Sequence, residues 1–138
     1  MSDILLIGTD ASLLEGISQT LSAVGFIPAI AHSFADAMRL ASATPPLLTI
    51  VNRTAVGSGA DLLRVPLARG GAVILYRTLD EHAPALPAPV QRAVLADLLL
   101  PLERARLVAL LHTVIERARH TTGGRVAPDD DAPVVPVP

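Results

Sequence analysis

The chain has 138 residues, about the length of one domain, with 51% apolar residues and a formal net charge of −2. It contains no cysteine, and all 11 of its basic residues are arginine. The composition therefore excludes disulfides, thiolate nucleophiles, cysteine-ligated metals, Schiff-base lysines and lysine-dependent phosphate loops. Arginine does not replace these groups, because it stays protonated and cannot act as a tunable base.

The distribution of charge and hydropathy narrows the class of partner. Residues 1–120 carry ten acidic and ten basic side chains, and the excess negative charge lies at residues 129–131. A nucleic-acid-binding domain usually shows a basic face, so we predict no contact with nucleic acid. The sequence shows no secretory signal pattern and no apolar run of about 18 residues, so we also predict a cytoplasmic protein without a membrane span.

The chain begins with a strand pattern followed by a helix pattern. Residues 4–7 form a continuous apolar run, which predicts a strand buried on both faces. Apolar residues then recur at helical spacing over residues 13–24. Asp10 or Ser12 is placed to cap this helix, and Gly25 is placed to end it.

The same alternation continues through the middle of the chain. Residues 26–31 predict a second strand, and Ser33 begins a second helix with an acidic residue in capping-box position. The two prolines at residues 45–46 break that helix. Residues 47–51 then form another apolar run, which predicts a third buried strand.

The second half of the chain adds two strands and a long helix. Residues 60–64 predict a short helix, and residues 72–76 predict a fourth strand without polar alternation. Three prolines rule out a regular helix across residues 82–89, so the fourth helix is expected to be short or disrupted. Residues 94–100 predict the fifth strand, and residues 103–120 predict the last helix.

The composition changes near residue 121. Residues 121–138 are rich in proline and aspartate and contain too few apolar side chains to offset the entropy of ordering them. We therefore predict one folded domain over residues 1–120 and a disordered tail or linker over residues 121–138.

Strands that alternate with helices predict a parallel sheet with helices on both faces. Five strands fit a doubly wound, flavodoxin-like α/β fold with the strand order 2-1-3-4-5. In such sheets the functional residues usually lie beyond the carboxyl ends of the strands. The residues at those positions here are Gly8, Thr9, Asp10, Asn52, Arg53, Arg77, Thr78, Leu100 and Pro101.

Four segments carry a resemblance to a known family. They read ILLIGTDASLLEGISQTLSAVGF, SFADAMRLASATPPLLTIVN, AVILYRT and LLLPLERARLVALLHTVIERAR. Over residues 1–120 their order and spacing resemble the receiver domain of two-component response regulators. The resemblance implies four functional features at the strand ends: a magnesium-binding pair of acids, a phosphorylated aspartate, a switch serine or threonine, and a Lys-Pro corner.

The magnesium and phosphoacceptor positions of that family are degenerate in this sequence. The acidic pair falls on Gly8 and Thr9, with Asp10 as the one carboxylate nearby, and the phosphoacceptor falls on Asn52. Magnesium prefers hard oxygen ligands that include carboxylates, and an amide does not form a stable acyl phosphate. The resemblance therefore implies a pseudo-receiver that binds no metal or cofactor and is not an enzyme.

The switch and corner positions of the family also depart from its pattern. The switch hydroxyl falls on Arg77, or on Thr78 if the register slips by one residue. The corner lysine falls on Leu100, and only the following Pro101 is kept. These departures add to the reasons to expect no aspartyl phosphorylation.

The two arginines at the strand ends leave several alternatives open. Either Arg53 or Arg77 pairs with Asp10 and holds the surface in one signalling state, or both side chains point into solvent. A further alternative is that they bind a free anion. A displaced phosphoacceptor would have to be Asp10 or Asp61.

The stretch over residues 90–102 is richer in apolar side chains than one buried side of a strand requires, and exposed apolar patches often mark interfaces. We predict a protein partner, or a homodimer, bound through the 90–120 face. The interface candidates are Val94, Leu95, Leu99, Leu107 and Leu111. The alternative is that these side chains fill a core that is poor in aromatic residues.

Two functional hypotheses result from the sequence. The first is a non-catalytic, receiver-like signal-transduction module that acts by protein–protein contact. The second is a flavodoxin-like domain that binds a small ligand or cofactor in the crevice at the strand ends.

Overall fold

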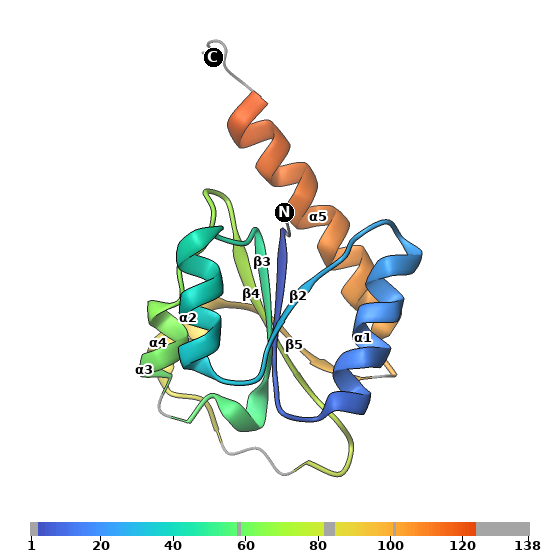
Figure 1. Ribbon diagram of the computed structural model, residues 1–138, viewed down its shortest axis with the longest axis vertical. Helices are drawn as coiled ribbons and strands as arrows, with labels where there is room; N and C mark the ends of the chain where they lie inside the picture. The colour runs from blue at the N-terminus through green and yellow to red at the C-terminus, as the bar shows by residue number, and fades with distance from the viewer. Residues whose placement is uncertain (1–2, 58, 82–84, 101, 124–138) are drawn as a thin grey trace.

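The computed structural model describes residues 3–57, 59–81, 85–100 and 102–123. Strands and helices alternate along this part of the chain (Figure 1). In chain order the elements are β1 (Ile4–Ile7), α1 (Ala11–Ala23), β2 (Ala29–Ala31), α2 (Phe34–Ala43), β3 (Leu48–Asn52), the 3-10 turn η1 (Arg53–Ala55), α3 (Ala60–Arg64), β4 (Ala72–Arg77), α4 (Ala88–Ala93), β5 (Val94–Leu99) and α5 (Arg104–Gly123).

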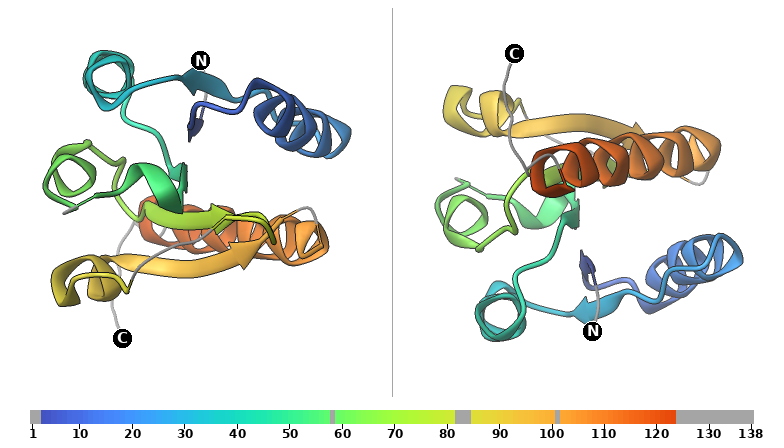
Figure 2. Two further views of the ribbon diagram at one scale, coloured as in Figure 1. Left: turned by 90° about the horizontal axis from the view of Figure 1, so that it is seen from below. Right: turned by 90° about the horizontal axis from the view of Figure 1, so that it is seen from above.

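The strands form one parallel sheet in the order β2-β1-β3-β4-β5, which confirms the predicted flavodoxin-like topology. Helices α1 and α5 cover one face of the sheet, and α2, α3 and α4 cover the other (Figure 2). The register places Asn52 of β3 directly beside Tyr76 of β4. The carboxyl ends of β1, β3 and β4 therefore meet at one edge of the molecule.

Two aliphatic cores, one on each face of the sheet, hold the layers together. Side chains on alternate positions of the central strands point into opposite cores, as the two-residue period of a strand requires. All four residues of β1 and all five of β3 are buried. This burial on both faces explains why these strands lack polar alternation in the sequence.

Local sequence signals set the helix boundaries. The Asp10 carboxylate accepts a hydrogen bond of 3.1 Å from the Leu13 N–H and caps α1. At the other end of α1, Gly25 has a φ of +94°, and the N–H of Phe26 donates to the Leu21 carbonyl. This pattern is a Schellman motif, in which a left-handed glycine ends the helix.

The starts of β2 and α4 differ from the prediction. Strand β2 begins at Ala29 rather than at residue 26, because Phe26 takes part in the end of α1. Helix α4 begins at Ala88, although no regular helix was expected before residue 90. Its proline at Pro89 lies in the first turn, where the missing N–H has no helical partner to lose.

The last helix also exceeds its predicted length. Helix α5 continues to Gly123, three residues beyond the predicted end of the folded domain. The rest of the predicted tail, residues 124–138, lies outside the described residues. Within the residues that are described, no helix combines the length and the apolar character that a membrane span needs.

Candidate functional site

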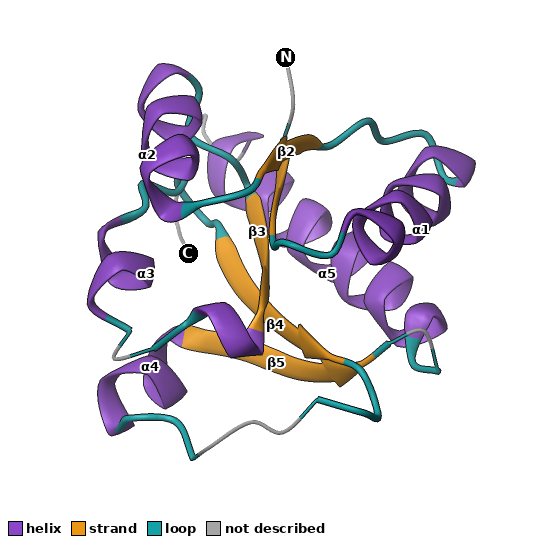
Figure 3. Cartoon of the chain, turned by 60° about the horizontal axis from the view of Figure 1, so that its bottom comes forward, coloured by secondary structure: helices purple, strands orange, loops and turns teal. Residues whose placement is uncertain are grey.

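The strand-end site predicted from the sequence is assembled by three strands and the loops that follow them (Figure 3). Residues Gly8, Thr9 and Asp10 follow β1, and Asn52 is the last residue of β3. Arg77 ends β4, and Thr78 begins the loop that leads toward α4. Gly8 and Asn52 are buried, whereas Thr9 and Asp10 are exposed.

Tyr76 fills the interior of this site. Its side chain is 0% exposed and belongs to the core between the sheet and the helices α1 and α5. The Tyr76 hydroxyl oxygen lies only 2.5 Å from the place that a Cβ atom at residue 8 would occupy. Any side chain at this position would collide with the tyrosine unless the ring moved. Gly8 and Tyr76 are therefore a matched pair, and together they close the space of a side chain directly after β1.

The environment of Tyr76 keeps its hydroxyl neutral. Burial raises the pKa of Tyr76 to about 12; the neighbouring Asn52 side chain opposes this shift, and the carboxylates of Glu81 and Asp10 add to it. Among the described residues, no group lies in hydrogen-bonding geometry with the buried hydroxyl. The interior of the site is therefore occupied by a neutral phenol, which supplies no charge to a cation or a phosphoryl group.

Both polar atoms of the Asn52 amide are engaged by its neighbours. Its Oδ1 accepts hydrogen bonds from the Thr54 N–H at 2.8 Å and from the Thr54 hydroxyl. Its Nδ2 donates to Glu81 Oε2 at 3.2 Å, and Glu81 Oε1 accepts from the Thr78 N–H at 2.9 Å. Glu81 thereby ties the loop after β4 to the end of β3.

The two strand-end arginines do not pair with Asp10. Arg53 Nη1 donates to Asp97 Oδ2 at 2.6 Å, an ion pair that crosses from the end of β3 to the outer strand β5. Among the described residues, no ion pair links Asp10 to Arg53 or Arg77, and the Asp10 carboxylate instead caps α1. The alternative in which an arginine locks the site through Asp10 is therefore wrong in this structure.

The corner after β5 is apolar. Leu100 is 2% exposed and packs in the core below α1 and α5, and Pro101 lies outside the described residues. The Leu99 N–H donates to Glu103 Oε1 at 2.7 Å, and this bond holds the pKa of the Glu103 carboxyl below its ordinary value. Weaker attraction from Arg106 and Arg77 acts in the same direction.

The predicted interface residues fall into two groups. Leu107 and Leu111 are each 1% exposed and pack in the core under α5, so their side chains are not available to a partner. Their helical stripe faces the sheet, which corrects their assignment to an interface. Val94 and Leu99 are partly buried, and Leu95 is 41% exposed.

The residues at the strand ends do not fit a magnesium ion. Gly8 offers no side chain and has no room for one. The Asp10 carboxylate caps α1, and the Glu81 carboxylate accepts hydrogen bonds from Asn52 and Thr78, so neither is free for a metal. Throughout the described ranges, no three histidine, aspartate or glutamate side chains gather as a metal-binding group.

Two residues of the site, Tyr76 and Glu81, are absent from the sequence-based candidates. The sequence predicts a strand over residues 72–76, which includes Tyr76, and it predicts no role for Glu81. One signal was present for the first of them: the only tyrosine of the chain stands at the end of an aliphatic strand, next to the predicted functional positions.

No protein-family model matches the sequence, and a search of curated proteins finds no relative. Solved structures do match. A receiver domain of a response regulator from Clostridium thermocellum superposes with a TM-score of 0.65 at 15% identity, covering 88% of this chain and 100% of that one. The chain has the receiver-domain fold.

Further solved structures support this assignment of the fold. A receiver-modulated diguanylate cyclase from Pelobacter carbinolicus gives a TM-score of 0.67 at 16% identity, covering 89% of this chain and 99% of that one. NtrX from Brucella abortus, solved in complex with ADP, gives a TM-score of 0.63 at 14% identity. That match covers 93% of this chain but 31% of NtrX, so receiver-like domains also occur as parts of longer proteins.

Proposed function

We propose that this chain is a receiver-type signal-transduction module that acts by protein–protein contact and is not phosphorylated on an aspartate. The observation that carries the proposal is the closed strand-end site, in which the Tyr76 hydroxyl occupies the space of a side chain at Gly8. The fold supports a signalling role, and the chemistry of the site supports its independence from phosphoryl transfer.

Three features of the site oppose phosphoryl transfer. The Asn52 amide has no negative charge, and both of its polar atoms are engaged by Thr54 and Glu81. A divalent cation would find the Asp10 and Glu81 carboxylates already engaged in hydrogen bonds. The corner position carries the buried Leu100, which cannot neutralise a phosphoryl group as a lysine does.

A phosphorylation assay tests this proposal directly. The purified chain is incubated with acetyl phosphate and Mg²⁺, and its intact mass is measured beside that of a phosphorylatable receiver domain treated in the same way. We expect no phosphoryl adduct on this chain, and none on an Asn52→Asp variant, because the metal ligands and the lysine are still missing. An adduct that maps to Asp10 or Asp61 of the wild-type chain would overturn the proposal.

For the contact surface we propose the side of the molecule formed by β5 and the following loop. Leu95 on β5 is 41% exposed, and Leu102 after it is 67% exposed. The occupant to test first is a second copy of the chain, because apolar side chains exposed in this way often mark interfaces. Light scattering should show a dimer that Leu95→Glu dissociates, and a monomer at high concentration would remove the homodimer.

The alternative of a ligand in the strand-end crevice receives less support. Tyr76 and the Asn52–Glu81 hydrogen bond occupy the space where such a ligand would lie. We also propose a cytoplasmic location, as the sequence predicts, and no contact with nucleic acid, because the charges of residues 1–120 balance.

A further inference from the structure

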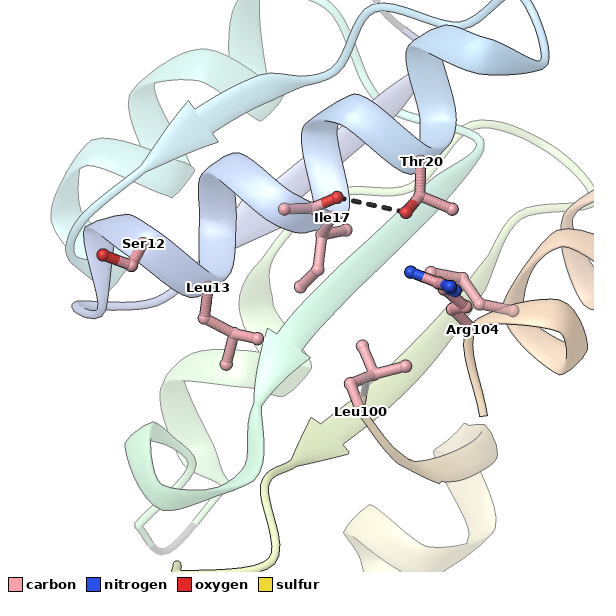
Figure 4. A pocket seen from close by; sticks show the side chains of 8 residues that line it. Ser12, Leu13, Ile17, Thr20, Leu100 and Arg104 are labelled. Carbon is pink, nitrogen blue, oxygen red and sulfur yellow. Dashed lines mark hydrogen bonds between the residues drawn. The ribbon is translucent and has the colours of Figure 1, made fainter. Parts of the chain in front are cut away.

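A hollow lies between α1 and the beginning of α5, on the same face of the sheet as Tyr76 (Figure 4). Its volume is about 220 Å³. The hollow is partly open to solvent, and its volume gives room for a ring or a short alkyl chain. Its lining is mostly apolar and comprises Ser12, Leu13, Gly16, Ile17, Thr20, Leu100, Arg104 and Leu107.

Gly16 contributes to this hollow by lacking a side chain. It lies in the middle of α1, where glycine destabilises a helix relative to alanine. A Cβ atom added at Gly16 would meet no atom within 4 Å, so tight packing is not what requires the glycine. The φ of Gly16 is not positive, so its backbone conformation does not require glycine either. Gly16 is exposed, so the glycine leaves open the side of the hollow that faces solvent.

Arg104 places a positive charge at the rim of this apolar space. The side chain extends from the first turn of α5 toward α1, near Thr20 (Figure 4). Among the described residues, no carboxylate pairs with Arg104, whereas the neighbouring Arg106 pairs with Glu103 at 3.4 Å. The Thr20 hydroxyl donates to the Gly16 carbonyl at 3.1 Å, so its oxygen keeps lone pairs but has its proton engaged.

We propose that this cavity is a binding site for a small amphiphilic carboxylate. The apolar body of the ligand, a ring or a short alkyl chain, would lie along Leu13 and Gly16, and its carboxylate would meet the exposed Arg104. Guanidinium and carboxylate form paired hydrogen bonds in a plane, which gives the site its preference for an anionic head. The inference does not depend on the proposed signalling function, because no strand-end residue except Leu100 lines the cavity.

The site is tested on the full chain with phenylacetate and hexanoate as probes. Binding is followed by calorimetry and by amide shifts in the NMR spectrum, which should move along α1 and the first turn of α5. Fragment-sized probes of this kind bind with dissociation constants on the order of 1 mM. Phenylacetamide has the same shape without the charge and acetate has the charge without the body, so both should bind at least about tenfold more weakly.

Matched variants separate the two halves of the site. Gly16→Leu should cover the hollow and abolish binding of phenylacetate while leaving the protein folded, because Gly16 is exposed and its added Cβ atom meets no other atom. Arg104→Gln should weaken binding about tenfold and remove the preference over phenylacetamide. Ala43→Leu, beside a cavity of about 230 Å³ near α2, and Arg92→Gln on α4 are the controls that should leave binding unchanged.

Three outcomes would overturn the proposal. One is the absence of binding for both probes at concentrations well above 1 mM, the scale expected for such fragments. The second is equal binding of phenylacetate and phenylacetamide to the wild-type chain. The third is binding that survives Gly16→Leu, which would place the ligand elsewhere. A phosphoryl adduct in the acetyl phosphate assay would leave this inference intact, so the two proposals fail separately.

Discussion

Two glycines on the same face of the sheet give opposite results. At Gly8 the space of the missing side chain is taken by the Tyr76 hydroxyl, 2.5 Å from where a Cβ atom would lie. Gly16 is exposed, no atom lies within 4 Å of its Cβ position, and the residue borders the hollow between α1 and α5. The strand-end site, which the fold makes the expected place for function, is closed, and a second site on the same face is open. A glycine in the sequence therefore does not by itself predict an open site, because neighbouring side chains can fill the space that it leaves.

The largest expected effect comes from adding a methyl group at each glycine. Gly8→Ala forces the buried Tyr76 ring out of its place and should lower the free energy of unfolding by roughly 1–3 kcal/mol. Gly16→Ala meets no atom and should raise it by up to about 1 kcal/mol. Urea denaturation of both variants measures the contrast.

A double variant then assigns the cost at Gly8 to the tyrosine. Tyr76→Phe removes the hydroxyl and should recover a large part of the stability that Gly8→Ala loses, because contacting residues couple by roughly 0.5–3 kcal/mol. Equal stabilities of the two alanine variants, or a double variant without recovery, would refute the pairing of Gly8 with Tyr76.

The second effect concerns the ionisation of Tyr76. Its pKa is raised to about 12 in the folded chain, above the ordinary value of 10.0. The stability that this difference represents is complete below pH 10 and is lost as the pH rises toward 12. A shift of two units corresponds to roughly 2.7 kcal/mol at about 1.36 kcal/mol per unit.

The chain offers a clean measurement of that ionisation. Tyr76 is the only tyrosine and there is no tryptophan, so the ultraviolet difference spectrum of phenolate reports this one group. We expect a titration displaced well above that of the urea-unfolded chain, accompanied by alkaline loss of structure. A folded chain that titrates like the unfolded one would show that Tyr76 is not the buried centre of the site.

The contact of Gly8 with Tyr76 and the hydrogen bond of Asn52 with Glu81 show how far the sequence predicts the structure. The strand order and the positions of Asn52 and Leu100 at the strand ends follow from the apolar runs and their spacing. The role of Tyr76 does not, because a strand buried on both faces has no alternation to show which core each side chain enters. Glu81 was missed for another reason: its hydrogen bond with Asn52 joins residues 29 apart in the chain, and local sequence pattern carries no information on such contacts.

A smaller effect is expected where Asn52 meets Glu81. Asn52→Asp replaces the amide that donates to Glu81 Oε2 by a second carboxylate about 3.2 Å away. Like charges at this distance raise the pKa of one carboxyl and should lower the free energy of unfolding by roughly 1–2 kcal/mol at neutral pH. The folded chain then binds more protons than the unfolded chain, so the loss should shrink as the pH falls.

Glu81→Gln in the Asn52→Asp background provides the matched control, since a glutamine amide can donate to the new carboxylate. Denaturation should show that the double variant regains most of the lost stability. A single variant as stable as the wild type at neutral pH would mean that Asn52 and Glu81 are not engaged with each other in solution.

The smallest expected effect on stability is at Glu103, which lies after β5, between the site at Gly8 and the hollow beside α1. Glu103 accepts the Leu99 N–H, and this bond lowers the pKa of its carboxyl below the ordinary 4.5. A group with a lowered pKa contributes stability above its unfolded pKa, and the contribution disappears as the pH falls through the folded value. Glu103→Gln should therefore be slightly less stable than the wild type at neutral pH, and the difference should vanish well below pH 4.5.

This last variant also bears on the cavity. The Glu103 carboxylate accepts a hydrogen bond from the Leu99 N–H and pairs with Arg106, so it does not pair with Arg104. If Glu103 instead competed for Arg104 in solution, Glu103→Gln would tighten phenylacetate binding at neutral pH. We expect unchanged binding, with Glu116→Gln on the exposed side of α5 as the control that removes the same charge farther from the cavity. Tighter binding in Glu103→Gln alone would show that Glu103 pairs with Arg104 when no ligand is bound. The hollow beside α1 would then be partly closed by the chain's own side chains, as the site at Gly8 is.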